Sequence, residues 1–168
     1  MTFEQAYDNY YDIVYKAVYM RLLNREDTED VVQETFIKAM KAWDSFDETK
    51  SKIQTWLCSI AKNTMLNSIR DNKKHKNPSF DELAEAGFDP GRDDEELLSL
   101  TDDYAKEAYE ILVQLKDSDR ELLAMRYGEE LSYKEIAAAL SSNDKAVAKR
   151  VERLLCKCRE LHSNILSK

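Results

Sequence analysis

The chain has 168 residues, a formal net charge of −8, and a composition that is 43% hydrophobic and 35% charged. It contains only two prolines and three glycines, too few for a β-sandwich or β-barrel, which needs a turn about every 8–12 residues. The apolar share is sufficient for a folded core and excludes wholesale disorder. We therefore expect an all-α protein.

Neither the N-terminal residues nor the cysteines indicate export. No apolar run approaches the roughly 18 residues of a membrane span, and the first residues, MTFEQAYDNYYD, have neither the basic start nor the apolar stretch of a signal peptide. Cys58, Cys156 and Cys158 cannot all pair within one chain. The sequence therefore predicts reduced thiols in a cytoplasmic protein with no membrane insertion of its own.

Charge is distributed unevenly along the chain. Residues 1–77 contain 12 basic and 12 acidic side chains, residues 78–104 contain 1 and 10, and residues 105–168 contain 12 and 11. The middle segment also holds both prolines and two of the three glycines, and this composition is typical of a linker. The sequence thus predicts two small helical domains, 1–77 and 105–168, joined by an acidic flexible linker. The alternative is one domain with a long surface loop, which would be unusual at this length.

The first domain is predicted to begin with two helices. Apolar residues recur in steps of three and four from Phe3 to Leu22, as on one face of a helix. Five of the nine tyrosines lie there, where core packing explains them better than a cofactor site. A second helix is predicted to open at Asp27 or Thr28, because acids in the first turn suit the positive end of the helix dipole. Its predicted inward face is Val31, Val32, Thr35, Phe36, Ala39, Met40 and Trp43.

Residues 44–52 are polar and predict a loop, which a third helix follows. Its predicted inward face is Ile53, Trp56, Leu57, Ile60, Ala61 and Met65. Its other face carries Lys62, Asn63, Asn67 and Arg70 and runs out into Lys73, Lys74, His75 and Lys76. Cations at a helix C-terminus are stabilising by themselves, whereas a face of Asn, Arg and Lys also suits contacts with bases and phosphates. Composition leaves both explanations open.

The second domain shows the pattern of a helix-turn-helix. A first helix is predicted from the apolar residues Ala105, Ala108, Tyr109, Leu112 and Leu115. Capping boxes are predicted at Ser118–Glu121, opening a helix that ends at Tyr127–Gly128, and at Ser132–Glu135. The second box opens a short helix, 133–140, with Ile136, Ala137 and Leu140 inward, before a turn at 141–144 with Asn143 or Asp144 as cap. A long helix follows, its inward face being Val147, Val151, Leu154, Leu155, Cys158 and Leu161, and this succession is typical of DNA-binding domains.

Cations line the outer face of that long helix. Lys145, Lys149, Arg153 and Lys157 recur at a spacing of four, with Arg150 beside them. Like charges at this spacing destabilise an isolated helix by about 0.2–0.5 kcal/mol per pair, so the pattern favours an anionic partner, such as a phosphate backbone, over a merely solvated face.

Three motifs in this order resemble those of bacterial sigma factors of the extracytoplasmic-function (ECF) group, within the sigma-70 family. The acidic motif is Asp27-Thr-Glu-Asp-Val-Val-Gln-Glu-Thr-Phe36, and the next helix of the family resembles Lys52–Asn63 with its continuation to Arg70. The segment Leu131–Leu140 is similar to the first helix of the family's helix-turn-helix. The resemblance covers nearly the whole chain apart from 78–104.

The resemblance implies a promoter-specificity subunit of RNA polymerase that is not itself an enzyme and uses no cofactor or metal. Its implied partners are the polymerase core, promoter DNA and an anti-sigma factor. The polymerase-binding residues would be Asp30, Gln33, Glu34 and Phe36. The −10 element would be opened and bound by the 44–52 loop with Trp56, Asn63, Asn67, Arg70 and Lys73. The −35 element would be bound by Lys145, Ala146, Lys149, Arg150 and Arg153.

The chain departs from the family in its last two helices. The turn usually carries Gly and a branched apolar residue where Ser141 and Ser142 stand, and the recognition helix here begins Lys145-Ala-Val-Ala148. These changes leave open a regulatory or interaction protein on the same fold, which would bind polymerase or a partner without starting transcription. A DNA-binding repressor is a third alternative. Cys158 and His162 lie four residues apart and could begin a metal site, but no fourth ligand is evident.

Overall fold

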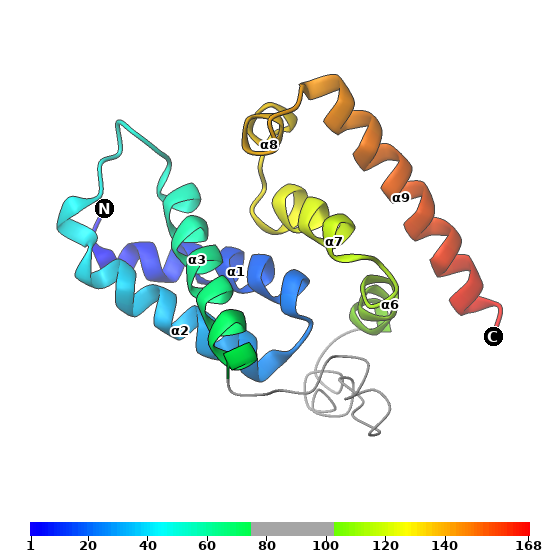
Figure 1. Ribbon diagram of the computed structural model, residues 1–168, viewed down its shortest axis with the longest axis horizontal. Helices are drawn as coiled ribbons and strands as arrows, with labels where there is room; N and C mark the ends of the chain where they lie inside the picture. Colours follow the sequence, from blue (N-terminus) through cyan, green and yellow to red (C-terminus); the bar gives the residue numbers. More distant parts are fainter. Residues whose placement is uncertain (75–102) are drawn as a thin grey trace.

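The computed structural model describes residues 1–74 and 103–168, and the predicted linker lies almost wholly outside them. All regular structure in these two ranges is helical, which confirms the all-α expectation (Figure 1). The N-terminal domain contains α1 (Phe3–Leu22), α2 (Arg25–Lys41), a 3₁₀ turn η1 (Trp43–Ser45) and α3 (Ile53–Lys74). The C-terminal domain contains α6 (Asp103–Leu112), α7 (Asp117–Leu123), the π-helical turn η2 (Ala124–Gly128), α8 (Tyr133–Ala139) and α9 (Asp144–Leu166). None of the described helices is long and apolar enough to cross a membrane.

The N-terminal domain is a three-helix unit around one apolar core. The buried residues of this core come from all three helices: Val14, Ala17, Val18, Val31, Val32, Phe36, Ala39, Leu57, Cys58, Ala61 and Met65. Helix α2 begins at Arg25, two residues before the predicted start, because the side chain of Asn24 accepts a hydrogen bond from the backbone N–H of Asp27 at 2.9 Å. An asparagine in this position satisfies one of the free donors of the first turn.

Aromatic side chains border this core more than they fill it. Tyr7, Tyr11, Tyr15 and Tyr19 form a ladder along α1, with successive ring centroids 5.3, 6.2 and 6.2 Å apart, and Tyr7 is exposed. The expectation of tyrosines inside the core is therefore only partly correct. A second aromatic group joins the 44–52 loop to its neighbours, because Phe46 packs on Trp56 at 4.8 Å and both contact Trp43.

The C-terminal domain has its own core. Its buried residues are Leu115, Leu122, Leu123, Met125, Leu131, Ile136, Ala137, Val147, Val151 and Leu154. The capping box predicted at Ser132–Glu135 is confirmed, with both of its hydrogen bonds present. The box predicted at Ser118–Glu121 is wrong, because α7 begins at Asp117 after Lys116 and has no side-chain cap. Leu140, predicted to lie inward, is exposed.

The helix-turn-helix consists of α8, a tight turn and α9. Ser141 has a φ of 52°, in the left-handed region that favours glycine, so the serine adopts this turn at some conformational cost. The N–H of Ser142 donates to the carbonyl of Ala137 at 2.8 Å, and the side chain of Asn143 caps α9 by accepting from Ala146 at 2.9 Å. The turn is therefore formed despite its two serines.

The two domains pack directly against each other, which the sequence analysis does not predict. The C-terminal half of α1 lies against α7 and η2. The approach is closest at Gly128, where an added Cβ would lie 2.8 Å from the Cα of Ala17. Glycine is required here because the opposing atom belongs to the backbone and cannot rotate away.

Candidate polymerase and promoter interfaces

The predicted polymerase-binding residues divide into an exposed group and one buried residue. Asp30, Gln33 and Glu34 are exposed on α2, and Glu34 forms an ion pair with Lys38 at 2.6 Å. Phe36 is only 4% exposed and packs against Tyr7 at 4.7 Å between ring centroids. In this structure Phe36 is a core residue that holds α2 in place, and its ring is not presented to a partner.

Two apolar residues of α2 extend this exposed face and were missed. Ile37 is 50% exposed and Met40 is 55% exposed. Met40 was assigned to the inward face, which is wrong, because that stripe was drawn too wide. At 100° per residue, Gln33, Ile37 and Met40 lie within about 60° of one another, next to Asp30 and outside the buried stripe of α2. Ile37 and Met40 are neighbours one turn apart, and an exposed apolar patch rimmed by polar residues favours a protein-binding surface more than a single exposed residue does.

The residues predicted to bind the −10 element lie on one face of α3. Asn63, Asn67 and Arg70 are exposed, and Arg70 donates to the side chain of Asn67 at 2.9 Å. Trp56 lies on the same face nearer the start of the helix and is half-buried against Phe46. The side chain of Lys73 lies outside the described residues.

Lys62 does not belong to that exposed face. Its ammonium forms an ion pair with Glu121 of α7 at 2.7 Å, and its side chain is half-buried between the two domains. The sequence could not distinguish Lys62 from its neighbours, since its partner is remote in the chain.

The predicted −35 residues are all exposed at the start of α9 or one to two turns beyond it. They are Lys145, Ala146, Lys149, Arg150 and Arg153. In the described part of the chain their four cations form no ion pair, whereas Lys157, further along the helix, approaches Asp119 at 3.4 Å. The long helix therefore presents unneutralised positive charge at its N-terminal half, while Val147, Val151 and Leu154 bury its opposite side.

The cysteines and histidine do not form a site together. His162 contacts Glu107 at 2.7 Å, and within residues 1–74 and 103–168 no three side chains of the metal-binding types converge. Burial raises the pKa of Cys58 to about 12, so this thiol stays protonated in the core.

A charge cluster joins the two domains. Arg21 of α1 binds Glu121 at 2.6 Å and also binds Glu129, and it donates to the carbonyl of Ala17 at 2.8 Å. The side chain of Arg21 is only 8% exposed. With Lys62, the cluster contains two cations from one domain and two acids from the other. Burial by itself would raise the pKa of Glu121, but the hydrogen bonds and charges of Arg21 and Lys62 outweigh it and lower that pKa to about 2.

This lowered pKa predicts a specific acid sensitivity. Because the pKa of Glu121 falls from 4.5 to about 2 in the packed form, its stabilising contribution is complete above pH 4.5 or so and is lost as the pH falls towards 2. We expect Glu121→Gln to flatten the dependence of the urea midpoint on pH in that window. Glu130→Gln, at an exposed acid of the neighbouring turn, is the control and should keep the wild-type slope. An equal dependence of the urea midpoint on pH in the wild type and both variants would contradict the lowered pKa of Glu121.

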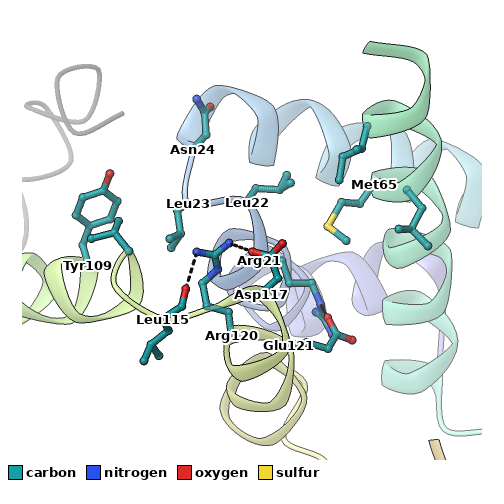
Figure 2. Close-up of a pocket in the computed structure, with 13 residues that line it drawn as sticks. Arg21, Leu22, Leu23, Asn24, Met65, Tyr109, Leu115, Asp117, Arg120 and Glu121 are labelled. Carbon is teal, nitrogen blue, oxygen red and sulfur yellow. Dashed lines mark hydrogen bonds and ion pairs between the residues drawn. The ribbon is translucent and has the colours of Figure 1, made fainter. Parts of the chain in front are cut away.

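A cavity lies beside this cluster, between the domains. Its volume is about 710 Å³, and its walls come from the end of α1, the C-terminal half of α3, α6 and the start of α7 (Figure 2). Leu66, Ile69 and Val113 supply much of its apolar lining and are all exposed. Arg120 closes one side and donates to the carbonyl of Leu115 and to Asp117. The interface is thus well packed near Gly128 and poorly packed here.

A helix-turn-helix whose second helix carries a row of exposed cations is typical of the DNA-binding class of proteins. The family model for Sigma-70 region 2 matches residues 6–75, and that for Sigma-70, region 4 matches residues 105–158. The RNA polymerase sigma factor YlaC of Bacillus subtilis is 33% identical over 82% of this chain and 78% of that protein. The ECF RNA polymerase sigma factor SigM of the same species is 29% identical over 92% of this chain and 93% of that protein. Among solved structures, the sigma factor RpoE from Bartonella quintana, in complex with the anti-sigma factor NepR, has a TM-score of 0.67 at 19% identity and covers 95% of each chain.

The chain therefore belongs to the ECF group of sigma-70 family sigma factors, which direct core RNA polymerase to specific promoters and initiate transcription.

Proposed function

We propose that three separate exposed faces divide the work of this sigma factor. The face of α2 around Asp30, Gln33 and Glu34, with Ile37 and Met40, binds core polymerase. The face of α3 around Asn63 binds the opened −10 element, and the start of α9 binds the −35 element in the major groove. The observation that carries this division is the row of exposed cations on α9, which form no ion pair with the residues that the structure describes and which would repel one another on a merely solvated helix.

The polymerase-docking and −10 domain spans residues 1–77, and the −35 domain spans residues 105–168. The acidic segment 78–104 joins them. The protein acts in the cytoplasm with polymerase and is not an enzyme by itself. Its regulator is an anti-sigma factor, and the support for this partner is the similarly folded RpoE, which was solved with NepR.

The direct test of the function is transcription by purified core polymerase with and without the chain. We expect a promoter-specific transcript only when the chain is present. Binding to polymerase without a transcript would instead favour the regulatory protein. Specific binding to duplex DNA without polymerase would favour the repressor.

Within that assay, Asn63→Ala should slow promoter opening more than initial promoter binding. Opening extrudes bases from the stack at a cost of a few kcal/mol, and a side-chain amide that hydrogen-bonds an extruded base offsets part of this cost. Asn63 is exposed, so its loss leaves the core intact. Permanganate footprinting measures promoter opening. Asn9→Ala makes the same change at an exposed position of α1 and serves as the control. Equal loss at both steps would contradict the assignment.

A further inference from the structure

The loop between η1 and α3 is tied together by one carboxylate. Asp47 Oδ1 accepts hydrogen bonds from the backbone N–H of Thr49 at 2.9 Å and from the hydroxyl of Thr49 at 2.6 Å. Asp47 Oδ2 forms an ion pair with Lys50 at 3.2 Å, and the carbonyl of Asp47 accepts from the backbone N–H of Lys50 at 3.0 Å. The hydrogen bonds of Thr49 and Lys50 hold the pKa of Asp47 below its usual value, so the side chain is ionised at neutral pH. A single side chain therefore holds residues 47–50 in a closed turn.

Little else in the described structure supports this turn. Among the residues that the structure describes, the hydrogen bonds and ion pairs of residues 47–51 are all internal to the loop. Glu48, Thr49 and Lys50 are exposed, so apolar burial does not fix their backbone either. A segment with few buried apolar contacts has a low local stability. The conformation of the loop therefore depends on the contacts that Asp47 makes.

The start of the loop is fixed beside the proposed −10 face of α3. The loop leads directly into the first turn of that helix (Figure 1). Phe46, the residue before Asp47, packs on Trp56 of α3 with 4.8 Å between ring centroids. Asn63 follows Trp56 by seven residues, so it lies within about 20° of Trp56 around α3 and about 10 Å further along the helix. A strand of DNA that lies along this face therefore runs past both Asn63 and the loop.

We propose that Asp47 is a positioning residue of the −10 site, and that it holds the 44–52 loop in its DNA-binding conformation before DNA arrives. This proposal rests on the assignment of α3 and the loop to the −10 element. Ordering a flexible loop during binding costs conformational entropy, and a loop that is already ordered avoids this cost. A wall that stays in place also discriminates better between bases, because it cannot move to accommodate a wrong one. Asp47 thus acts through the loop and not by touching a base.

Two substitutions of Asp47 separate its geometry from its charge. Asp47→Ala removes both the acceptor and the charge, whereas Asp47→Asn removes the charge and keeps an oxygen that can accept from Thr49. In NMR relaxation of the full chain, we expect backbone order parameters of about 0.85 for residues 48–50 in the wild type and below about 0.6 in Asp47→Ala. Asp47→Asn should stay close to the wild type, and circular dichroism should show unchanged helix in both variants. A loop that remains ordered in Asp47→Ala would overturn the proposal.

Promoter opening by the holoenzyme, meaning core polymerase with the chain bound, tests what the ordered loop does. The probe is a promoter that the wild-type holoenzyme selects from DNA randomised over the −35 and −10 elements. Asp47→Ala should slow opening about three- to tenfold and reduce the preference for the selected base at one or more −10 positions by a similar factor, while initial binding stays within about twofold of the wild type. Asp47→Asn should restore opening to within about twofold of the wild type. Asp8→Ala, at an exposed position of α1, is the control and should behave as the wild type.

The same variants distinguish an error about Asp47 from an error about the −10 site. Equal defects in Asp47→Asn and Asp47→Ala would mean that the charge matters and the turn does not, which would overturn the positioning role. Equal loss of initial binding and opening would overturn it as well. If Asn63→Ala slows opening while Asp47→Ala, with a loop shown to be mobile, does not, only the role of Asp47 is wrong. If neither substitution changes opening, the assignment of α3 and the loop to the −10 element is wrong, and the role of Asp47 is refuted with it.

Discussion

Glu34→Lys should weaken binding to core polymerase by about tenfold or more while leaving the fold intact. The side chain is exposed on α2 and its described ion pair is with Lys38 at 2.6 Å, a surface contact of about 0.3–0.5 kcal/mol. Reversing its charge therefore lowers the stability of the helix by only a few tenths of a kcal/mol. Placing a like charge opposite a charge of the partner lowers the free energy of binding by roughly several kcal/mol. Competition binding to labelled core polymerase measures the change.

Two further variants decide whether the face as a whole is the interface. Asp12→Lys makes the same change of charge at an exposed position of α1 and should leave polymerase affinity unchanged. Met40→Ala removes an apolar side chain that is already 55% exposed, so the free protein loses little, while a contact buried at an interface would lose about 1 kcal/mol or more. Unchanged affinity for both Glu34→Lys and Met40→Ala would remove α2 from the polymerase interface.

Most of the secondary structure was predictable because it is a local property. Apolar residues in steps of three and four predict the three helices of the first domain, which the structure confirms. The capping box at Ser132–Glu135 correctly predicts the start of α8. The errors at Met40 and Leu140 share a cause. Both continue an apolar pattern in the sequence, yet each faces solvent because no neighbouring element covers that side of its helix.

The charge cluster between the domains was not predictable, because its residues have ordinary surface patterns. The spacing of Ser118 and Glu121 fits a capping box, and only the fold shows that Glu121 instead faces Arg21, one hundred residues earlier in the chain. Lys62 likewise stands next to the exposed Asn63, and the sequence does not distinguish the two environments. The sequence correctly predicts a helix end at Gly128, but only the fold shows that the close approach of Ala17 requires glycine there. Long-range complementarity of charge and shape leaves no periodic trace in a single sequence.

The predicted DNA-binding residues are exposed and lie outside the charge cluster between the domains. Asn63 and Arg70 are exposed, whereas Lys62, about 80–100° around α3 from them, pairs with Glu121. The cations at the start of α9 are exposed as well. Substituting these side chains therefore removes no buried contact between the domains.

Arg150→Ala should cost about 1–3 kcal/mol of promoter binding and relax the base preference at one position of the −35 element. Arg150 is exposed near the start of α9, and its planar guanidinium matches the two acceptors that guanine presents in the major groove. Lys149→Ala should instead weaken binding to all sequences alike and lower the slope of affinity against salt by about one, because an ammonium on a phosphate releases one counterion and carries no base information. Binding of the polymerase complex to promoters with single changes in the −35 element separates the two effects.

Arg159→Ala is the matched control for both, since this exposed cation lies about 14 Å further along α9 than Arg150 and about 15 Å further than Lys149. It should change neither the affinity nor the salt slope. A protein-binding role for the cations of α9 predicts a different result, in which Lys149→Ala and Arg150→Ala leave the upstream promoter contacts untouched. In that case the exposed charges on α9 would have to be explained by an acidic protein partner, and the −35 assignment would be withdrawn, while the membership of the family would stand on its sequence matches.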